Sequence, residues 1–302
     1  MAIKFTAKKI SQSIMENFEI QRSPEKILTL IENFLKSQGI DEATAFETAS
    51  EMLYPVRDEI SQILQRQRTD GVISSCELVD DDFTTIIGSA YKRPRDTSDK
   101  LKYRESLPYL NEIWQTLVEL QPYEFELFCT KLLKFMGAEE AFTSKRTRDE
   151  GIDFIARLRF RNTFGDIGIE SIERNFFINI FGQAKRYNKE NKVGTGEIRE
   201  LIGSLSVLRY QDILNTNVSE INNKYGTIKL CDPIISIFLT TGLFSPPAKQ
   251  LAETTGVVIK DGKQLSTYLA IHRIGFEKRD NILTFTPERL LSWISGTLES
   301  AE

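Results

Sequence analysis

The sequence has little of what several common site chemistries require. It contains a single histidine, His272, which argues against catalytic triads, histidine acid–base pairs and metal sites with several histidines. Its three cysteines, Cys76, Cys129 and Cys231, are far apart and form no C-x-x-C pair, which argues against a zinc site and a disulfide scaffold. Hydrolytic chemistry in this chain must therefore depend on carboxylates, amides, lysine and a metal ion bound from solution.

Long apolar segments are also missing. The sequence has no apolar run of the roughly 18 residues that a membrane span needs. The first residues, Met1 to Phe5, lack the apolar region of a signal peptide. We therefore expect a cytoplasmic protein without a membrane partner. The length of 302 residues favours two domains or one large domain.

The charge is unevenly distributed. The formal net charge is −4, which by itself is unfavourable for nucleic-acid binding. Residues 1–100 hold 13 Lys and Arg against 17 Asp and Glu, whereas residues 143–209 hold 13 against 9. Because phosphates respond to the local field, the second segment is a candidate nucleic-acid surface. The alternative is a solvated basic face with no ligand.

The first hundred residues are predicted to be mainly helical. A helix is expected over 24–38, with Ser23 as its cap and Pro24 in its first position. A second helical stretch is expected over 41–67, broken near Pro55.

A short strand at 71–79 and a charged linker at 92–106 follow. The rest of the chain shows an α/β pattern that ends in a strand and a helix. The expected helices are at 109–119, 122–137, 196–209, 263–271, after Pro246-Pro247 and from Pro287, and the expected strands are at 140–146, 152–160, 176–185, 234–240, 257–260 and 281–285.

Three polar residues are predicted to converge on this sheet. Gln183 and Lys185 lie two positions apart on one strand, so their side chains point to the same face. Asp153 lies at the start of the neighbouring strand. Gly151 and Gly182 precede these groups and could allow the backbone to approach a ligand closely.

This combination suits phosphodiester hydrolysis. A hard cation is held by oxygen ligands, which Asp153 and the Gln183 amide can supply. A lysine such as Lys185 offsets the negative charge that accumulates on the phosphate. The alternative is that all three are ordinary residues at strand ends.

Glu126 lies at the border of the apolar face of the 122–137 helix and could reach the same site as a further metal ligand. The alternative is a first-turn carboxylate that favours the helix dipole, a role for which Glu124 is better placed.

Basic residues next to these strands are candidates for phosphate contacts. The alternative for each is a solvated surface charge. The candidate DNA-binding residues are Lys145, Arg146, Arg148, Arg186, Tyr187, Lys189 and Lys192.

With these residues in view, residues 110–272 resemble the catalytic domain of Mrr-like restriction endonucleases, in the PD-(D/E)XK nuclease superfamily. The expected order of helix, three strands, helix and strand is also the core topology of that superfamily. The matching segments are Tyr123-Glu124-Phe125-Glu126-Leu127, Asp149-Glu150-Gly151-Ile152-Asp153, Gly182-Gln183-Ala184-Lys185-Arg186-Tyr187, Ile198-Arg199-Glu200-Leu201, Thr240-Thr241-Gly242-Leu243 and Asp261-Gly262.

The resemblance implies DNA cleavage dependent on Mg²⁺, with Mn²⁺ as a substitute. It implies Asp153, Gln183 and Lys185 as catalytic residues, Glu126 in support, and a role in restriction of foreign or modified DNA. Two departures from the family pattern are Glu150, where the family has glycine, and an apparent insertion at 161–175. The alternatives are a repair nuclease for branched DNA or RNA, and a DNA sensor that does not cut.

The predicted fold class is α/β. It consists of a restriction-endonuclease-like core, with a mixed sheet flanked by helices, and a mainly helical N-terminal domain. The expected domains are residues 1–105, for target recognition or contact with a partner protein, the nuclease domain 106–275, and a C-terminal extension 276–302. Because one active site serves one strand, a homodimer or higher homo-oligomer is expected.

Overall fold

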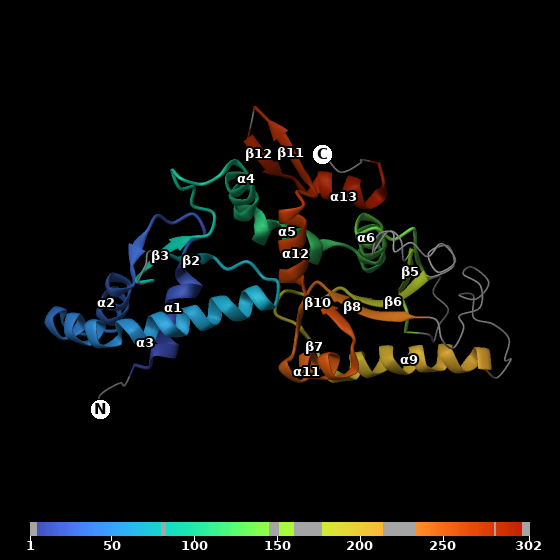
Figure 1. Cartoon of the computed structure of the whole chain (residues 1–302), viewed down its shortest axis with the longest axis horizontal. Coiled ribbons are helices and arrows are strands. Elements are labelled where there is room, and N and C mark those ends of the chain that lie inside the picture. The colour runs from blue at the N-terminus through green and yellow to red at the C-terminus, as the bar shows by residue number, and fades with distance from the viewer. Residues whose placement is uncertain are drawn as a thin grey trace, which may run out of the picture. The chain divides into compact units, whose positions relative to one another are not determined.

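The computed structural model describes residues 5–79, 83–144, 151–159, 177–213, 233–280 and 282–297 (Figure 1). The candidate DNA-binding residues at positions 145, 146 and 148, and the insertion at 161–175, lie outside the described residues. Contacts within the chain define two compact units. Unit 1 comprises Met1–Asn111 and Ser266–Thr286, and unit 2 comprises Glu112–Leu265 and Pro287–Ser300.

Unit 1 begins with three helices around an apolar core, which confirms a mainly helical N-terminal region. Ile10, Ile31, Ala49 and Ile60 are fully buried in this core. A small antiparallel sheet accompanies the helices, with the strand order β1-β3-β2. The elements are α1 (Ala7–Asn17), β1 (Glu25–Lys26), α2 (Ile27–Ser37), α3 (Glu42–Thr69), β2 (Cys76–Val79) and β3 (Thr85–Gly88).

The predicted start of the helix at 24–38 was wrong. Residues 25–26 form strand β1, and Ile27 N donates to Thr84 O at 2.9 Å. Helix α2 therefore begins at Ile27, without a side-chain hydrogen bond at its cap. Pairing with a strand about 60 positions away outweighs the local capping preference of Ser23 and Pro24.

The predicted break at Pro55 was also wrong. Helix α3 runs through Pro55 from a cap at Asp41, whose carboxylate accepts from Thr44 N at 3.1 Å. Pro55 removes one hydrogen bond from the helix. The buried face formed by Ala45, Ala49, Val56 and Ile60 continues on both sides of it. Tertiary packing of this face is what keeps the helix continuous.

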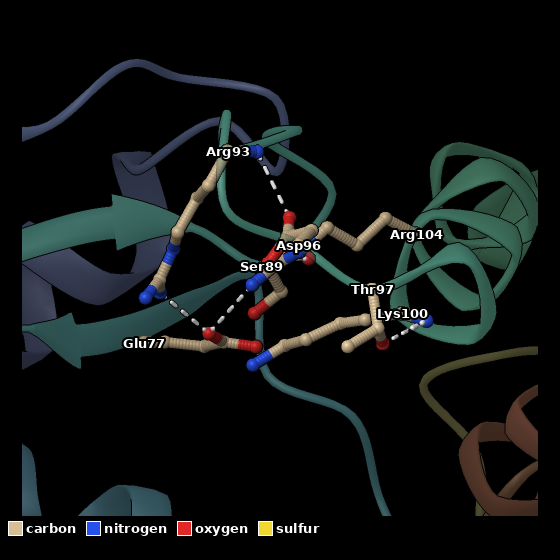
Figure 2. Close-up of polar contacts among 7 residues, drawn as sticks. All are labelled: Glu77, Ser89, Arg93, Asp96, Thr97, Lys100 and Arg104. Carbon is tan, nitrogen blue, oxygen red and sulfur yellow. Dashed lines mark hydrogen bonds and ion pairs between the residues drawn. The ribbon is translucent and has the colours of Figure 1, made fainter.

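The charged segment 92–106 is folded and is not a linker throughout (Figure 2). Helix α4 (Ser98–Ser106) carries Arg104, whose side chain is fully buried. Its guanidinium lies 2.9 Å from Asp96 and 3.1 Å from Glu77, and it donates to the carbonyl oxygen of Ser89. Arg93 lies 2.9 Å from the same Glu77. The charges were misleading because they pair with one another inside the unit.

Later parts of the chain complete unit 1. The turn η1 (Leu107–Tyr109) follows α4, and strand β11 (Phe276–Arg279) pairs with β12 (Ile282–Phe285) in an antiparallel hairpin. The expected strand at 281–285 corresponds to β12, whereas β11 was not predicted.

In the described residues of unit 2, five strands form a mixed sheet with the order β10-β8-β6-β5-β4. Strands β4, β5 and β6 are antiparallel, whereas β6, β8 and β10 are parallel. Strands β7 (Lys192–Val193) and β9 (Leu243–Phe244) form a separate, two-stranded parallel sheet. The strands are β4 (Glu140–Thr143), β5 (Phe154–Arg159), β6 (Phe177–Lys185), β8 (Ile234–Thr240) and β10 (Val258–Lys260).

Helices cover both faces of this sheet, with α6 on one side and α9 and α11 on the other (Figure 1). On the α9 side, Phe181 and Phe238 of the sheet pack with Ile198, Leu201 and Ala248 of the helices. This arrangement confirms the predicted fold class. The helices of unit 2 are α6 (Pro122–Phe135), α9 (Thr195–Ile213), α11 (Pro246–Thr255) and α13 (Pro287–Ser295). Helix α5 (Leu110–Glu119) belongs to unit 2 from Glu112 onward, and α12 (Gly262–Ile271) belongs to it up to Leu265.

Within the described ranges, every helix falls short of the length or the apolarity that a bilayer crossing demands.

Candidate active site

Asp153 closes the end of the β5–β6 ladder. Its backbone N donates to Gly182 O at 2.8 Å, and its carboxylate Oδ2 accepts from Ala184 N, also at 2.8 Å. Phe154 is paired with Gly182, so in an antiparallel register Asp153 lies opposite Gln183. The structure thus brings Asp153 and Gln183 together, as the sequence predicted for paired strands.

Gln183 is a buried amide in the middle of this arrangement. Its side chain is 1% exposed, and among the described residues its Oε1 finds no hydrogen-bond partner. Leaving such an oxygen buried and unsatisfied costs about 1–3 kcal/mol. Lys185 lies two residues further along β6, on the same face and only half-buried. The unsatisfied acceptor of Gln183 therefore lies opposite Asp153 in the strand register and shares its strand face with Lys185.

Glu126 approaches the same region from α6. The thiol of Cys129, one turn further along that helix, is fully buried. Burial raises the pKa of Cys129 well above its ordinary value, and the negative charges of Asp153 and Glu126 raise it further. Both carboxylates therefore act electrostatically on the same thiol. By contrast, Glu124 caps the helix, since its Oε2 accepts from Gln121 N at 2.7 Å.

The polypeptide after Lys185 is tied to the end of β8. Thr240 Oγ1 donates to Lys185 O at 2.8 Å. Thr241 Oγ1 donates to Tyr187 O at 2.7 Å and accepts from Tyr187 N at 2.8 Å. Both threonines are fully buried. These bonds fix the direction of the chain just beyond Lys185, a role that the sequence did not reveal for either threonine.

Two of the candidate DNA-binding residues in the following loop contact α5. Arg186 Nη1 donates to Val118 O at 3.4 Å, and Lys189 Nζ lies 5.1 Å from the centre of the Trp114 ring. Trp114 and Val118 are four residues apart and share one face of α5. Trp114 was not among the candidate residues predicted from the sequence.

The other two described candidates, Tyr187 and Lys192, are arranged differently. Tyr187 donates from its hydroxyl to Glu197 Oε1 at 3.3 Å, and burial together with the charge of Glu197 raises the pKa of that hydroxyl. Lys192 is exposed on strand β7. Glu197 Oε2 also accepts from Gly194 N at 3.1 Å, so a carboxylate already occupies the start of α9. Tyr187 is therefore committed to an internal contact, whereas Lys192 faces solvent.

Internal packing requires glycine at positions 151 and 182. A Cβ atom at Gly182 would overlap the ring of Phe154, which is fully buried. Gly151 has a φ of +59°, and a Cβ atom there would lie 2.6 Å from Ser204 Oγ on α9. Glycine is required at each position because a neighbouring side chain occupies the space.

The oxygen groups at this site fit a hard divalent cation. Among the described residues, no three His, Cys, Asp or Glu side chains form a metal-binding group. The set discussed here is different, because it combines the carboxylates of Asp153 and Glu126 with the amide oxygen of Gln183. Oxygen ligands of this kind are those that Mg²⁺ and related ions accept, and the unsatisfied Oε1 of Gln183 matches such a role.

The central part of the chain matches a known protein family. Residues 117–222 match the Mrr_cat family model, described as restriction endonuclease. This match confirms the resemblance to Mrr-like nucleases for a segment that contains Glu126, Asp153, Gln183 and Lys185. No curated protein matches the chain.

Several solved structures are similar at low identity. The DNA modification-dependent restriction endonuclease AspBHI is 17% identical with a TM-score of 0.42, covering 63% of this chain and 39% of that one. The MspJI restriction endonuclease in complex with a 27-mer oligonucleotide is 17% identical with a TM-score of 0.40, covering 68% and 40%. The chain thus spans about two fifths of the length of these proteins. The likeness to restriction endonucleases therefore rests on the family match of residues 117–222.

Proposed function

We propose that this chain, whose residues 117–222 match a restriction endonuclease family, is a Mg²⁺-dependent endonuclease that hydrolyses DNA phosphodiester bonds. Its role would be the restriction of foreign or modified DNA. Mn²⁺ is the expected substitute for Mg²⁺. The active site would consist of Asp153, Gln183, Lys185 and Glu126, each within the matched segment.

The observation that carries the proposal is the environment of Gln183. A buried amide oxygen without a hydrogen-bond partner is unfavourable in a protein that has no ligand for it. It becomes favourable where a cation binds beside Asp153. The same strand face also carries Lys185, whose positive charge would offset the negative charge that accumulates on the phosphate during hydrolysis.

When bound, the cation would polarise a phosphate oxygen and acidify a water molecule. Asp153 and Glu126 would contribute negative oxygen ligands, and Gln183 a neutral one. The N–H group of Ala184 fixes one Asp153 oxygen by a hydrogen bond of 2.8 Å, so the carboxylate is oriented before any ligand arrives. Orientation of this kind lowers the cost of assembling the site.

Lys185 has the complementary task. As water attacks phosphorus and the bond to the leaving oxygen breaks, negative charge accumulates on the phosphate oxygens. The Lys185 ammonium would offset that charge. The bonds from Thr240 and Thr241 to the backbone at Lys185 and Tyr187 hold the strand end in place, so the ammonium requires little reorganisation.

One such site serves one strand, so we further propose that a homodimer or higher homo-oligomer makes double-strand breaks. The predicted role of residues 1–105 in target recognition or contact with a partner protein belongs to the same proposal.

A substrate panel tests the function. Purified protein is incubated with supercoiled plasmid, in modified and unmodified forms, and with branched DNA and RNA of similar length, each with Mg²⁺ and with excess EDTA. We expect nicked or linear plasmid with Mg²⁺ and none with EDTA. Cleavage confined to branched DNA or RNA would indicate a repair nuclease instead. Binding without cleavage of any substrate would indicate a sensor and would overturn the proposal.

A further inference from the structure

Trp114 is held in a fixed position on the surface of unit 2. Its indole Nε1 donates to Thr241 O at 2.7 Å, so its edge is joined to the same turn that fixes the end of β6. The neighbouring residue Gly262 has no side chain, and a Cβ atom there would overlap both Nε1 of Trp114 and the carbonyl oxygen of Thr241. The ring itself is only partly buried. One face of a rigid aromatic group is therefore available to other side chains.

Two lysines from different elements meet at this ring. Lys189, in the loop after β6, has its Nζ 5.1 Å from the ring centre, and Lys263, in the first turn of α12, has its Nζ 5.8 Å from it. Both distances are within the range of cation–π attraction. The ring thus gathers two positive charges from different elements at one place on the surface, and such a local field attracts phosphates.

Two acidic groups lie within electrostatic reach of these lysines, Glu119 for Lys189 and Asp261 for Lys263. Asp261 is 5% exposed, and its Oδ1 accepts from Gln264 N at 3.0 Å at the start of α12. Glu119 Oε1 accepts from Gln115 Nε2 at 2.8 Å. Burial lowers the pKa of Lys189, and this effect outweighs the negative charge of Glu119, which raises the pKa. The attraction between this ammonium and a phosphate is stronger than in bulk water, because the effective dielectric constant near the protein surface is lower.

The position of the ring relates it to the proposed active site. Arg186 and Lys189 contact α5 at Val118 and at Trp114, one helical turn apart. The chain therefore carries positive groups from the end of β6 along α5 to the ring. A free phosphate ion would need one such group, whereas a polymer with regularly spaced phosphates suits a row of them.

We infer that Trp114, Lys189 and Lys263 form a platform that binds the phosphodiester backbone of DNA beside the cleavage site. The inference rests on the proposed function, because it takes DNA as the ligand. The indole holds both lysines in place, and the lysines contact phosphates. This platform would add affinity and register without reading the base sequence.

The chain offers a direct optical test, because Trp114 and Trp293 are its only two tryptophans. Trp293 is 3% exposed and lies 6.3 Å from Phe128, ring centre to ring centre. In the variant Trp293→Phe, emission therefore reports on Trp114 alone. We expect that emission to change as duplex DNA is added in EDTA, with the same midpoint as the anisotropy of a labelled duplex. Emission that stays constant across the binding curve would overturn the inference.

A second measurement does not depend on Trp293. Lys263→Ala and Lys189→Ala should each weaken DNA binding and reduce the slope of log affinity against log salt by about 0.9, since each removes one phosphate contact. Lys134→Ala, at an exposed lysine of α6, is the matched control and should leave the slope unchanged.

The two failures are distinguishable. If the parent protein binds and cuts DNA while Lys263→Ala keeps the parent slope, the platform is wrong and the proposed function stands. If the parent protein neither binds nor cuts DNA, the proposed function fails, and the platform fails with it.

Discussion

Gln183 is a neutral ligand candidate, and its neutrality can be tested. In Gln183→Glu, an oxygen remains on the same strand face and gains a charge, so Mg²⁺ should bind more tightly. We expect a lower Mg²⁺ concentration for half-maximal plasmid cleavage. In Gln183→Leu, the oxygen is lost at similar volume, and cleavage should be poor at any Mg²⁺ concentration. The measurement is a Mg²⁺ titration of the three proteins, with folding compared by circular dichroism.

Equal half-maximal Mg²⁺ values in all three proteins would remove Gln183 from the metal site. Asp153 and Glu126 would then remain as its candidate ligands.

Gly182 provides a test of packing at the same strand. Gly182→Ala forces a methyl group into the ring of Phe154, which is fully buried and cannot swing away. We expect a loss of about 1–3 kcal/mol in the free energy of unfolding, measured by urea denaturation. Gly203→Ala on α9 is the control, because its Cβ atom would meet nothing within 4 Å. That variant should gain about 0.5–1 kcal/mol.

If Gly182→Ala has the same urea midpoint as the parent, the close packing of Phe154 against Gly182 does not contribute to the free energy of unfolding. A smaller residue at position 154 supplies the converse test, since Phe154→Leu should cost less in the Gly182→Ala background than in the parent.

At the level of single residues, alternation along one strand was sufficient to place Gln183 and Lys185 on one face. The position of Asp153 opposite Gln183 required the additional assumption that the two strands pair. The partners of the glycines could not be predicted, because Ser204 and Phe154 reach them through the fold. The roles that we assign to Asp153, Gln183, Lys185 and Glu126 stay predictions.

At the level of elements, the turn after β8 is expected to control the loop after β6. Thr241→Val keeps the shape of the side chain but removes the hydroxyl that bonds Tyr187 N and O. A buried group that loses its partner costs about 1–3 kcal/mol. We therefore expect a lower urea midpoint and weaker DNA binding, by fluorescence anisotropy. Thr241→Ser retains the hydroxyl and should behave nearly like the parent. Equal losses in both variants would assign the effect to packing.

Periodicity in the sequence identified most elements of unit 2, since strands of continuous apolar residues and helices with a single apolar stripe are distinctive. In unit 1 it was less informative. β1 exists because residues 25–26 pair with β3, and α4 can bury Arg104 because Asp96 and Glu77 neutralise its charge. Neither cause can be read from the local sequence.

At the level of the whole molecule, the ion network of unit 1 predicts a pH dependence of stability. Burial by itself would raise the pKa of Asp96, but the Arg93 N–H group and the charges of Arg104, Lys100 and Arg93 outweigh it and lower the pKa below the ordinary value of 3.8. The unfolded chain therefore binds this proton more tightly. The stabilisation is complete above the ordinary pKa and is lost as the pH falls through the lowered one.

Thermal unfolding should reveal this contribution. Between about pH 5 and about pH 3, the melting temperature of the parent should fall more steeply than that of Asp96→Asn, which has no carboxylate to protonate. Parallel curves for the two proteins would show that Asp96 contributes nothing to the acid sensitivity.

The return of a distant segment to unit 1 also lies beyond sequence reasoning. Tyr109 donates from its hydroxyl to Leu283 O at 3.1 Å, and Arg273 Nη2 donates to Lys102 O at 2.7 Å. These contacts join residues more than 170 positions apart, and nothing in the local pattern of either segment indicates them. The predicted domains at 1–105, 106–275 and 276–302 remain a prediction.

The central claim is that Asp153 and Lys185 perform chemistry rather than hold the fold together. The most direct test measures cleavage and binding on the same preparations of Asp153→Asn, Lys185→Met and the parent. Plasmid cleavage with Mg²⁺ is followed on gels, and affinity for a labelled duplex is followed in EDTA. We expect both variants to lose cleavage by at least about a hundredfold, the size of effect expected for removing a group that stabilises the transition state, while binding and melting temperature stay close to the parent values. Cleavage at the parent rate in either variant would contradict the account.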